Sequence, residues 1–126
     1  MKNTWRFGEQ EFVYVREVLD SGFGSSTSGS MNNRFETAFA GKIGAKYAVT
    51  FNSGTGTLHA ALDAVGVGYG DEVIVPNYTM VATPNSVKMI GAKPIFADVE
   101  KNTLFLDFNE LKKKITKKTK AVILVS

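Results

Sequence analysis

The chain has 126 residues, of which 44% are hydrophobic and 21% charged, so its length suits one domain with one core. Much of its net charge of +3 comes from one lysine-rich run without interleaved aromatic residues, which argues against nucleic-acid binding. The sequence has no cysteine, which excludes disulfides and thiolate chemistry, and no signal core or apolar run that could cross a bilayer. We therefore expect a cytoplasmic globular protein without a nucleic-acid or membrane partner.

The first part of the chain predicts two helices joined by a polar loop. Apolar residues recur at helical spacing over residues 9–19. The stretch 23–33, FGSSTSGSMNN, is rich in Gly and Ser, and it is either a flexible linker or a loop that closes over a ligand. Asn32 or Asn33 can cap a second amphipathic helix that continues to Ile43.

The stretch 47–62, YAVTFNSGTGTLHAAL, predicts a buried strand, a tight turn and the start of a helix. The first N–H groups of such a helix have no partners inside it and lie at the positive end of its dipole, so they can bind a phosphate. Gly54 and Gly56 let a ligand approach the backbone, and Thr55 or Thr57 can add a hydroxyl donor. A turn that only joins a strand to a helix, and binds nothing, would explain the same residues.

Two named nucleotide-binding motifs fit this turn poorly. The G-x-G-x-x-G fingerprint matches Gly54 and Gly56, but its third position is His59, which is too large for close packing of helix and strand. The acid that this fingerprint needs at the end of the second strand is Asn77 here, and the pattern G-x-x-x-x-G-K-[ST] is absent. The residues therefore give little support to a nicotinamide site or a P-loop.

The second half of the chain alternates strands and helices. We expect strands at 73–76, 94–97 and 121–125, a helix at 81–90, and a further helix capped by Asp107 or Asn109. The strands are short and continuously apolar, as in parallel sheets covered on both faces. The predicted fold class is therefore α/β, with three αβα layers around a mostly parallel sheet. Because ligand groups gather at the carboxyl ends of such strands, a chain that stops on a strand is expected to be a fragment.

Three long motifs carry a family resemblance. They are FETAFAGKIGAKYAVTFNSGTGTLHAALDAVGVGYGDEVIVP, NYTMVATPNSVKMIGAKPIFADVEKNTLFLD and ITKKTKAVILVS. Together, and in their spacing, they resemble the N-terminal part of the DegT/DnrJ/EryC1/StrS sugar aminotransferases, which are pyridoxal-phosphate enzymes of fold type I. The resemblance implies one partial domain from the large domain of that fold, with a helix and Ser/Gly loop in 1–33 and cofactor-binding βα units in 34–126.

The resemblance also implies roles for single residues. Gly54 and Thr55 would bind the phosphate of pyridoxal phosphate. Met80 would lie against the face of the pyridine ring, where many relatives have an aromatic residue, and plain core packing is its alternative role. The residues of the Ser/Gly loop that would face a sugar-nucleotide substrate are Ser25, Thr27 and Ser28. His59 occupies a position that varies among relatives, so we expect a packed or surface histidine, and no metal site is expected.

Two groups that the family chemistry needs have no match in this chain. They are the Schiff-base lysine and the acid that pairs with the pyridinium nitrogen, and in the family both lie downstream of Ser126. The lysines within 112–120 are expected on an exposed helix and its turn, and Asp98 and Asp107 match loop positions. No catalytic residue is therefore assigned, and the fragment by itself is expected to be inactive.

The complete enzyme implied by the resemblance would be a homodimer that moves an amino group, typically from glutamate, onto a keto-sugar nucleotide. Such a reaction serves the synthesis of surface polysaccharides or glycans. Some relatives dehydrate the sugar instead, so a pyridoxal-phosphate dehydratase is one alternative. A truncated, non-catalytic binding or regulatory module is another, and a nucleotide-binding α/β domain unrelated to pyridoxal phosphate is a third.

Overall fold

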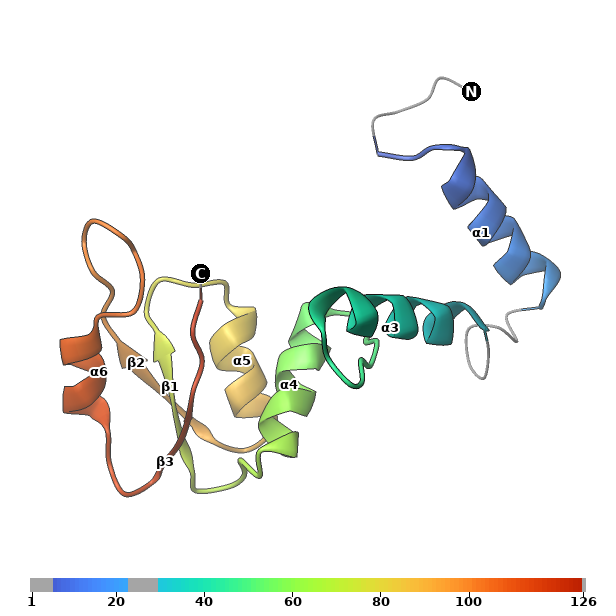
Figure 1. Ribbon diagram of the computed structural model, residues 1–126. Coiled ribbons are helices and arrows are strands. Elements are labelled where there is room, and N and C mark those ends of the chain that lie inside the picture. The colour runs from blue at the N-terminus through green and yellow to red at the C-terminus, as the bar shows by residue number, and fades with distance from the viewer. Residues whose placement is uncertain (1–5, 23–29, 126) are drawn as a thin grey trace. The chain divides into compact units, whose positions relative to one another are not determined.

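The computed structural model describes residues 6–22 and 30–125. The chain divides into two compact units, Met1–Thr50 and Phe51–Ser126, each with its own set of contacts. Figure 1 labels the helices and strands of both units. None of the helices in the described ranges is both long enough and apolar enough to cross a membrane.

The first unit begins with α1 (Glu9–Asp20), which confirms the helix predicted at 9–19. At its start, the N–H of Gly8 donates to the carboxylate of Glu11 at 2.6 Å. At its end, Gly22 takes a φ of 63°, a left-handed conformation that suits glycine. Both ends of α1 are thus determined by short-range contacts.

The next helix in the described part of this unit, α3 (Ser30–Ile43), starts earlier than predicted. Asn32 and Asn33 therefore lie inside the helix, and the prediction that one of them caps it is wrong. An asparagine inside a helix costs at most about 0.7 kcal/mol relative to alanine, so the first turn accommodates both. Farther along, the Arg34 guanidinium donates to the Glu17 carboxylate of α1 at 2.9 and 3.1 Å.

The buried strand predicted at 47–51 is absent from the described structure, and the prediction is wrong. The side chains of Tyr47 and Val49 are 75% and 71% exposed. A strand forms only beside a neighbour that completes its hydrogen bonds, and no strand in the described ranges pairs with this segment. The segment is tied to α3 instead, because the N–H and the hydroxyl of Thr50 donate to the Glu36 carboxylate at 2.7 and 2.8 Å. These bonds, the backbone one first, lower the pKa of Glu36.

The second unit is an α/β fold, as predicted. Its elements are α4 (Gly54–Ala64), β1 (Glu72–Pro76), α5 (Ala82–Met89), β2 (Lys93–Ala97), α6 (Phe108–Lys114) and β3 (Thr119–Val122). The strand order is β2-β1-β3 and both pairings are parallel, so β1 is central. The strands predicted at 73–76 and 94–97 are confirmed to within one residue, whereas β3 ends before the predicted residue 125.

The predicted helices of this unit are also present. α5 falls within the predicted range 81–90. α6 is capped by Asp107, whose carboxylate accepts hydrogen bonds from the N–H groups of Asn109 and Glu110 at 2.7 and 3.2 Å. Of the two residues considered as caps, Asp107 is therefore the one that acts, since its side chain reaches the free amides of the first turn.

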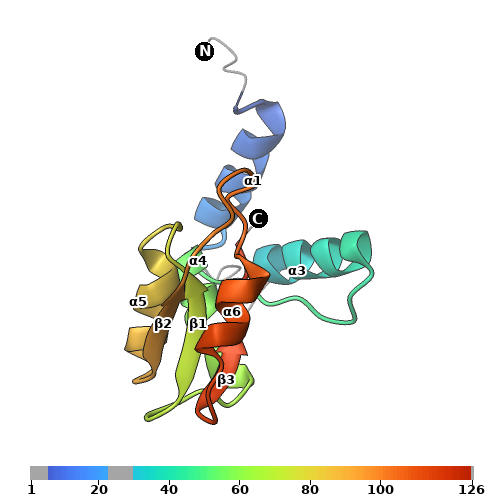
Figure 2. The ribbon, with the colours of Figure 1, turned by 90° about the vertical axis from the view of Figure 1, so that its left-hand side faces the viewer.

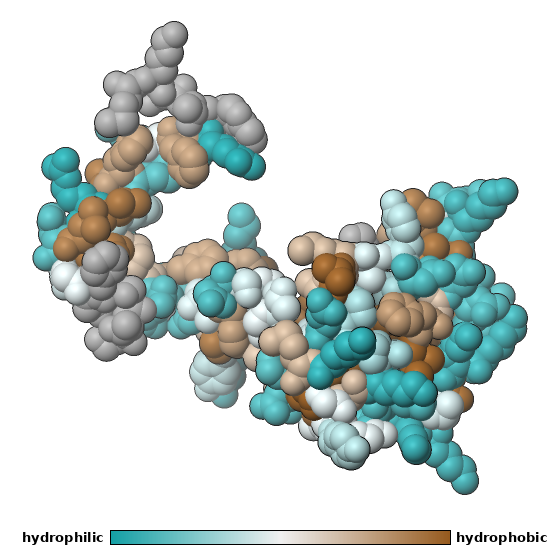
Figure 3. All heavy atoms as spheres, turned by 180° about the vertical axis from the view of Figure 1, so that it is seen from behind, coloured by the Kyte–Doolittle hydropathy of each residue, from teal (hydrophilic) through white to brown (hydrophobic). Residues whose placement is uncertain are grey.

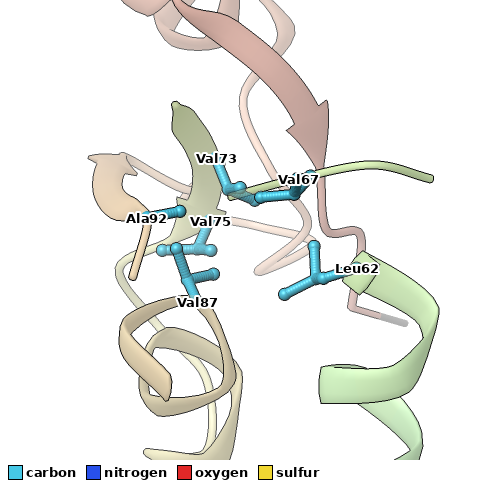
Figure 4. Packing of buried hydrophobic residues seen from close by; sticks show 6 residues of the cluster. All are labelled: Leu62, Val67, Val73, Val75, Val87 and Ala92. Atoms are coloured by element: carbon cyan, nitrogen blue, oxygen red, sulfur yellow. The ribbon is translucent and has the colours of Figure 1, made fainter. Parts of the chain in front are cut away.

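The core lies on both faces of β1, which makes three layers. On one face, the side chains that pack between the sheet, α4 and α5 are Leu62, Val67, Val73, Val75, Val87 and Ala92 (Figure 4). On the other face, Ile74 packs with Ala97 and with Leu111 of α6. Fully burying one such aliphatic side chain contributes about 1.5–3 kcal/mol. The alternation of Val73, Ile74 and Val75 between the two faces confirms the predicted αβα layering.

The basic run lies on the surface of α6, of the turn that follows it and of the start of β3. Its lysines, which are all exposed, are Lys112, Lys113, Lys114, Lys117, Lys118 and Lys120. The ammonium of Lys113 lies 2.6 Å from the Glu110 carboxylate, a pair that raises the lysine pKa. Figure 3 shows hydrophilic side chains on the side of this unit where α6 lies. The lysines of α6 and its turn thus form a solvated surface, as predicted, and Lys120 extends this surface onto β3.

The N-terminus of α4 and the turn after β1 lie at the same edge of the second unit. Because α4 leads from its own C-terminus into the amino end of β1, its N-terminus lies at the carboxyl edge of the sheet. Figures 1 and 2 show this end of α4 at the same edge as the turn after β1 and the last described residues of the chain. Ligands of open parallel sheets bind at this kind of edge.

Candidate functional site

The N-terminus of α4 combines a side-chain cap with free backbone amides. The hydroxyl oxygen of Ser53 accepts a hydrogen bond from the Gly56 N–H at 3.1 Å, and the Thr57 N–H donates to the Ser53 carbonyl at 3.1 Å. The N–H groups of Gly54 and Thr55 precede that first helical bond, so the helix offers them no carbonyl. These two amides, at the positive end of the dipole, are suited to an anion.

The space around Gly54 and the hydrogen bond of the Thr57 hydroxyl indicate which groups at this helix start can contact a ligand. A Cβ placed on Gly54 would meet no neighbouring atom within 4 Å, so a ligand can reach the backbone there. The Thr57 hydroxyl donates to the Ser53 carbonyl at 3.2 Å and is used within the turn. Of the two threonines that the sequence offered, Thr55 is therefore the better donor to a ligand. The Ser53 cap escaped the sequence analysis, although a serine directly before a Gly-Thr-Gly helix start is a known capping signal.

A cleft of about 570 Å³ opens at the carboxyl edge of the sheet, beside the turn after β1. Its lining residues are Asn77, Tyr78, Thr79, Met80, Thr103, Leu104, Phe105 and Val125. The Met80 side chain is 74% exposed, so it is not a core residue. Its backbone is held in place because the Thr83 N–H of α5 donates to the Met80 carbonyl at 3.0 Å. The mostly apolar walls suit a ring-shaped group more than a strongly hydrated one.

Asn77, on the rim of this cleft, is held by the loop after β2. Its side-chain amide donates to the Asp98 carboxylate at 2.8 Å, and the Val99 N–H donates to the same oxygen at 2.9 Å. These bonds, the Val99 one first, lower the pKa of Asp98. The backbone N–H of Asn77 also donates to the Ala97 carbonyl at 2.9 Å. The sequence analysis missed this tie; its only signal was that polar residues end two neighbouring parallel strands.

The residues predicted for the site do not all lie in the cleft. Met80 lines the cleft, whereas Gly54 and Thr55 do not line it and lie at the N-terminus of α4, on the same edge of the unit. His59 is half-buried in α4, away from the lining. The three residues predicted to face the substrate, Ser25, Thr27 and Ser28, lie outside the described residues. Every lysine in the described ranges is exposed, and none lines the cleft.

Residues 6–126 match the model of the DegT/DnrJ/EryC1/StrS aminotransferase family, and the chain belongs to that family. This confirms the resemblance found in the sequence and excludes a nucleotide-binding domain of unrelated origin. The GDP-perosamine synthase of Vibrio cholerae is 46% identical over 115 residues, which are 91% of this chain and 31% of that protein.

Two solved structures support the same fold. A protein from Streptococcus pneumoniae in its PMP form gives a TM-score of 0.87 at 33% identity, over 94% of this chain and 29% of that one. An Escherichia coli GDP-4-keto-6-deoxy-D-mannose-3-dehydratase with bound hydrated PLP gives 0.82 at 31% identity, over 96% of this chain and 32% of that one. The chain therefore spans about a third of the length of these relatives and has the N-terminal part of the fold type I architecture.

Proposed function

We propose that the complete protein is a pyridoxal-phosphate aminotransferase that transfers an amino group onto a keto-sugar nucleotide. Membership of the family and the similarity to a GDP-perosamine synthase support this function. The observation in this chain that carries it is the N-terminus of α4, with two free amides and open space at Gly54. This arrangement suits the phosphate of the cofactor.

The residues present fit that cofactor. The amides of Gly54 and Thr55 would hold its phosphate, with the Thr55 hydroxyl as a further donor. Met80, exposed in the apolar cleft on the same edge, would pack against its ring. When bound, the cofactor supplies the electron sink for chemistry at the carbon that gains or loses nitrogen. The part of this chain is to bind and orient that group and to shield the ring from water.

Further features of the complete protein belong to the same proposal. Glutamate is the amino donor, the protein is a cytoplasmic homodimer, and Ser25, Thr27 and Ser28 contact the sugar nucleotide. Residues 1–33 and 34–126 form one partial domain, in which the second range binds the cofactor. The exposure of all described lysines supports a required lysine elsewhere in the complete protein.

A dehydratase of the same family is the second candidate. It is favoured by the likeness to the Escherichia coli dehydratase, which is 31% identical to this chain. Either enzyme would use the same cofactor site, so the residues described above do not separate the two reactions.

One experiment tests both functions. The complete protein is first titrated with pyridoxal phosphate by absorbance, together with a Gly54→Val variant that should bind poorly. It is then given GDP-4-keto-6-deoxy-D-mannose and glutamate, and the sugar product is weighed by mass spectrometry. A product that gains nitrogen supports the aminotransferase, and one that loses oxygen without gaining nitrogen supports the dehydratase. A protein that binds the cofactor and leaves glutamate unchanged with every keto-sugar nucleotide tried would support the non-catalytic alternative.

A further inference from the structure

A closed hairpin contributes three of the residues that line the cleft, Thr103, Leu104 and Phe105. It connects β2 to α6, and an antiparallel bridge between Val99 and Leu106 closes its base. Above the base, the Glu100 N–H donates to the Phe105 carbonyl at 2.8 Å. Figure 1 shows this connection extending past the end of the sheet. Because its two arms are hydrogen-bonded to each other, the hairpin can hold side chains at a fixed place.

Leu104, near the tip, has a backbone conformation that leucine disfavours. Its φ is +60°, and it is the one non-glycine residue with a positive φ in the described part of the chain. A branched side chain is strained in this left-handed region, which glycine and asparagine tolerate far better. The conformation is fixed locally, since the Leu104 N–H donates to the Glu100 carbonyl at 2.9 Å and the Thr103 hydroxyl to the Glu100 carboxylate at 2.9 Å.

The strained residue is also an exposed apolar one. Leu104 and its neighbour Phe105 are 48% and 54% exposed, and both line the cleft. Neither the backbone geometry nor solvent contact favours leucine at this position. Strain of this kind persists where the surroundings enforce it, and it concentrates at ligand-binding sites. A ligand bound in the cleft would contact both side chains.

We propose that Leu104 and Phe105 form a ligand-contacting wall of the cleft, against which the aromatic ring of the bound cofactor packs. This inference rests on the proposed function, because it takes the pyridine ring of pyridoxal phosphate or pyridoxamine phosphate as the ligand. The left-handed backbone at Leu104 fixes the place of this wall. A residue better suited to the turn would relieve the strain and remove the apolar contact.

The test uses the complete protein and pyridoxamine phosphate, which binds without a covalent bond to lysine. Leu104→Asn relieves the backbone strain and makes the wall polar, whereas Leu104→Ala keeps the strain and shortens the side chain. Both should weaken pyridoxamine-phosphate binding about three- to tenfold, as expected for loss of part of one apolar contact. In the absence of ligand, the Asn variant should melt no lower than the wild type. The control Asn102→Ala changes an exposed residue of the same hairpin that does not line the cleft, and it should bind normally.

The possible outcomes distinguish a failure of the proposed wall from a failure of the proposed function on which it rests. Wild-type affinity in Leu104→Asn and Leu104→Ala would overturn the wall, as would affinity losses that only follow losses in melting temperature. Inorganic phosphate lacks a ring, so its inhibition constant against pyridoxamine phosphate should be the same in the wild type and the Leu104 variants. A higher inhibition constant in the variants would also count against the wall. Failure of the wild type to bind pyridoxamine phosphate would refute the proposed function itself. Binding that is lost in Gly54→Val and kept in the Leu104 variants would refute the wall alone.

Discussion

The two halves of the candidate site are built from different parts of the polypeptide. At the N-terminus of α4, the proposed binding groups are the backbone amides of Gly54 and Thr55, and the absence of a side chain at Gly54 leaves them accessible. In the cleft, the lining is made of side chains, above all Met80 and Leu104. An amide that bonds a charged phosphate is worth more than one that bonds a neutral group, while a side chain against a ring contributes dispersion and burial. The first half should therefore supply affinity, and the second half should orient the ring.

The largest effect is expected at Gly54. Replacing it with valine blocks the approach of a phosphate to two amides, and we expect the affinity for pyridoxal phosphate in the complete protein to fall about a hundredfold. Because a Cβ at this position meets no neighbouring atom within 4 Å, the fold should be unaffected. Titration followed by absorbance measures the dissociation constant. Gly56→Ala is the matched control, since its Cβ would be in ordinary contact 3.4 Å from the Ser53 hydroxyl and its amide is already bonded to that oxygen.

A smaller effect is expected at Met80. Met80→Ala removes packing and no hydrogen bond, so affinity should fall about three- to tenfold. Met80→Phe should restore or improve binding, because an aromatic ring stacks on a pyridine better than a thioether does. The same titration checks both variants. If Met80→Ala loses more affinity than Gly54→Val, the phosphate role of the α4 N-terminus has to be abandoned.

A pH-dependent effect is expected at the rim of the cleft. Hydrogen bonds from Val99 and Asn77 lower the pKa of Asp98 below its ordinary value of about 3.9. The folded state therefore gains stability that is fully present above about pH 4, and this gain is lost as the pH falls through the lowered pKa. In Asn77→Ala one of the two bonds is missing, so the difference in melting temperature from the wild type should be present at pH 7 and shrink toward pH 3. A difference that grows on acidification would contradict the tie between Asn77 and Asp98.

The smallest effect is expected from the lysines. All the lysines in the described ranges are exposed, and none has the buried setting that makes a lysine reactive toward a bound aldehyde. After incubation of the 126-residue chain with pyridoxal phosphate and reduction with borohydride, peptide mapping should find only scattered, low labelling. Stoichiometric labelling of one lysine would show that the chain holds a reactive lysine after all.

The parts of the fold that follow from short-range signals could be predicted. An apolar run between turn residues located β1 and β2, and an aspartate before an amphipathic run located the start of α6, because the physical cause lies within a few residues. The segment 47–51 has the same kind of sequence as β1, yet it forms no strand, because pairing depends on a neighbour that no local pattern contains. Asn32 failed as a cap for a related reason, since nothing local excluded an earlier helix start.

The candidate site also has features that the sequence could predict and features that it could not. The roles predicted for Gly54 and Met80 come from the family motifs that contain them, and they stay predictions. The hydrogen bond between Asn77 and Asp98 joins residues 21 positions apart and depends on β1 and β2 being neighbours in the sheet. The positive φ of Leu104 could not be foreseen, because leucine is among the residues least expected there. A tertiary contact decides the first feature, whereas the second is fixed by hydrogen bonds within the hairpin.

The strand order also affects how the unit is made during synthesis. β1 comes first of the three strands, but its two edges are completed at different times: by β2 about 20 residues later, and by β3 more than 40 residues later. Ribosomes add roughly 5–20 residues per second, so one edge of the most apolar strand of the unit stays unpaired for roughly two to nine seconds. During that time a nascent chain exposes backbone groups that can pair with another nascent chain. Slower translation through residues 77–118 should therefore increase aggregation during synthesis without changing the stability of the finished fold.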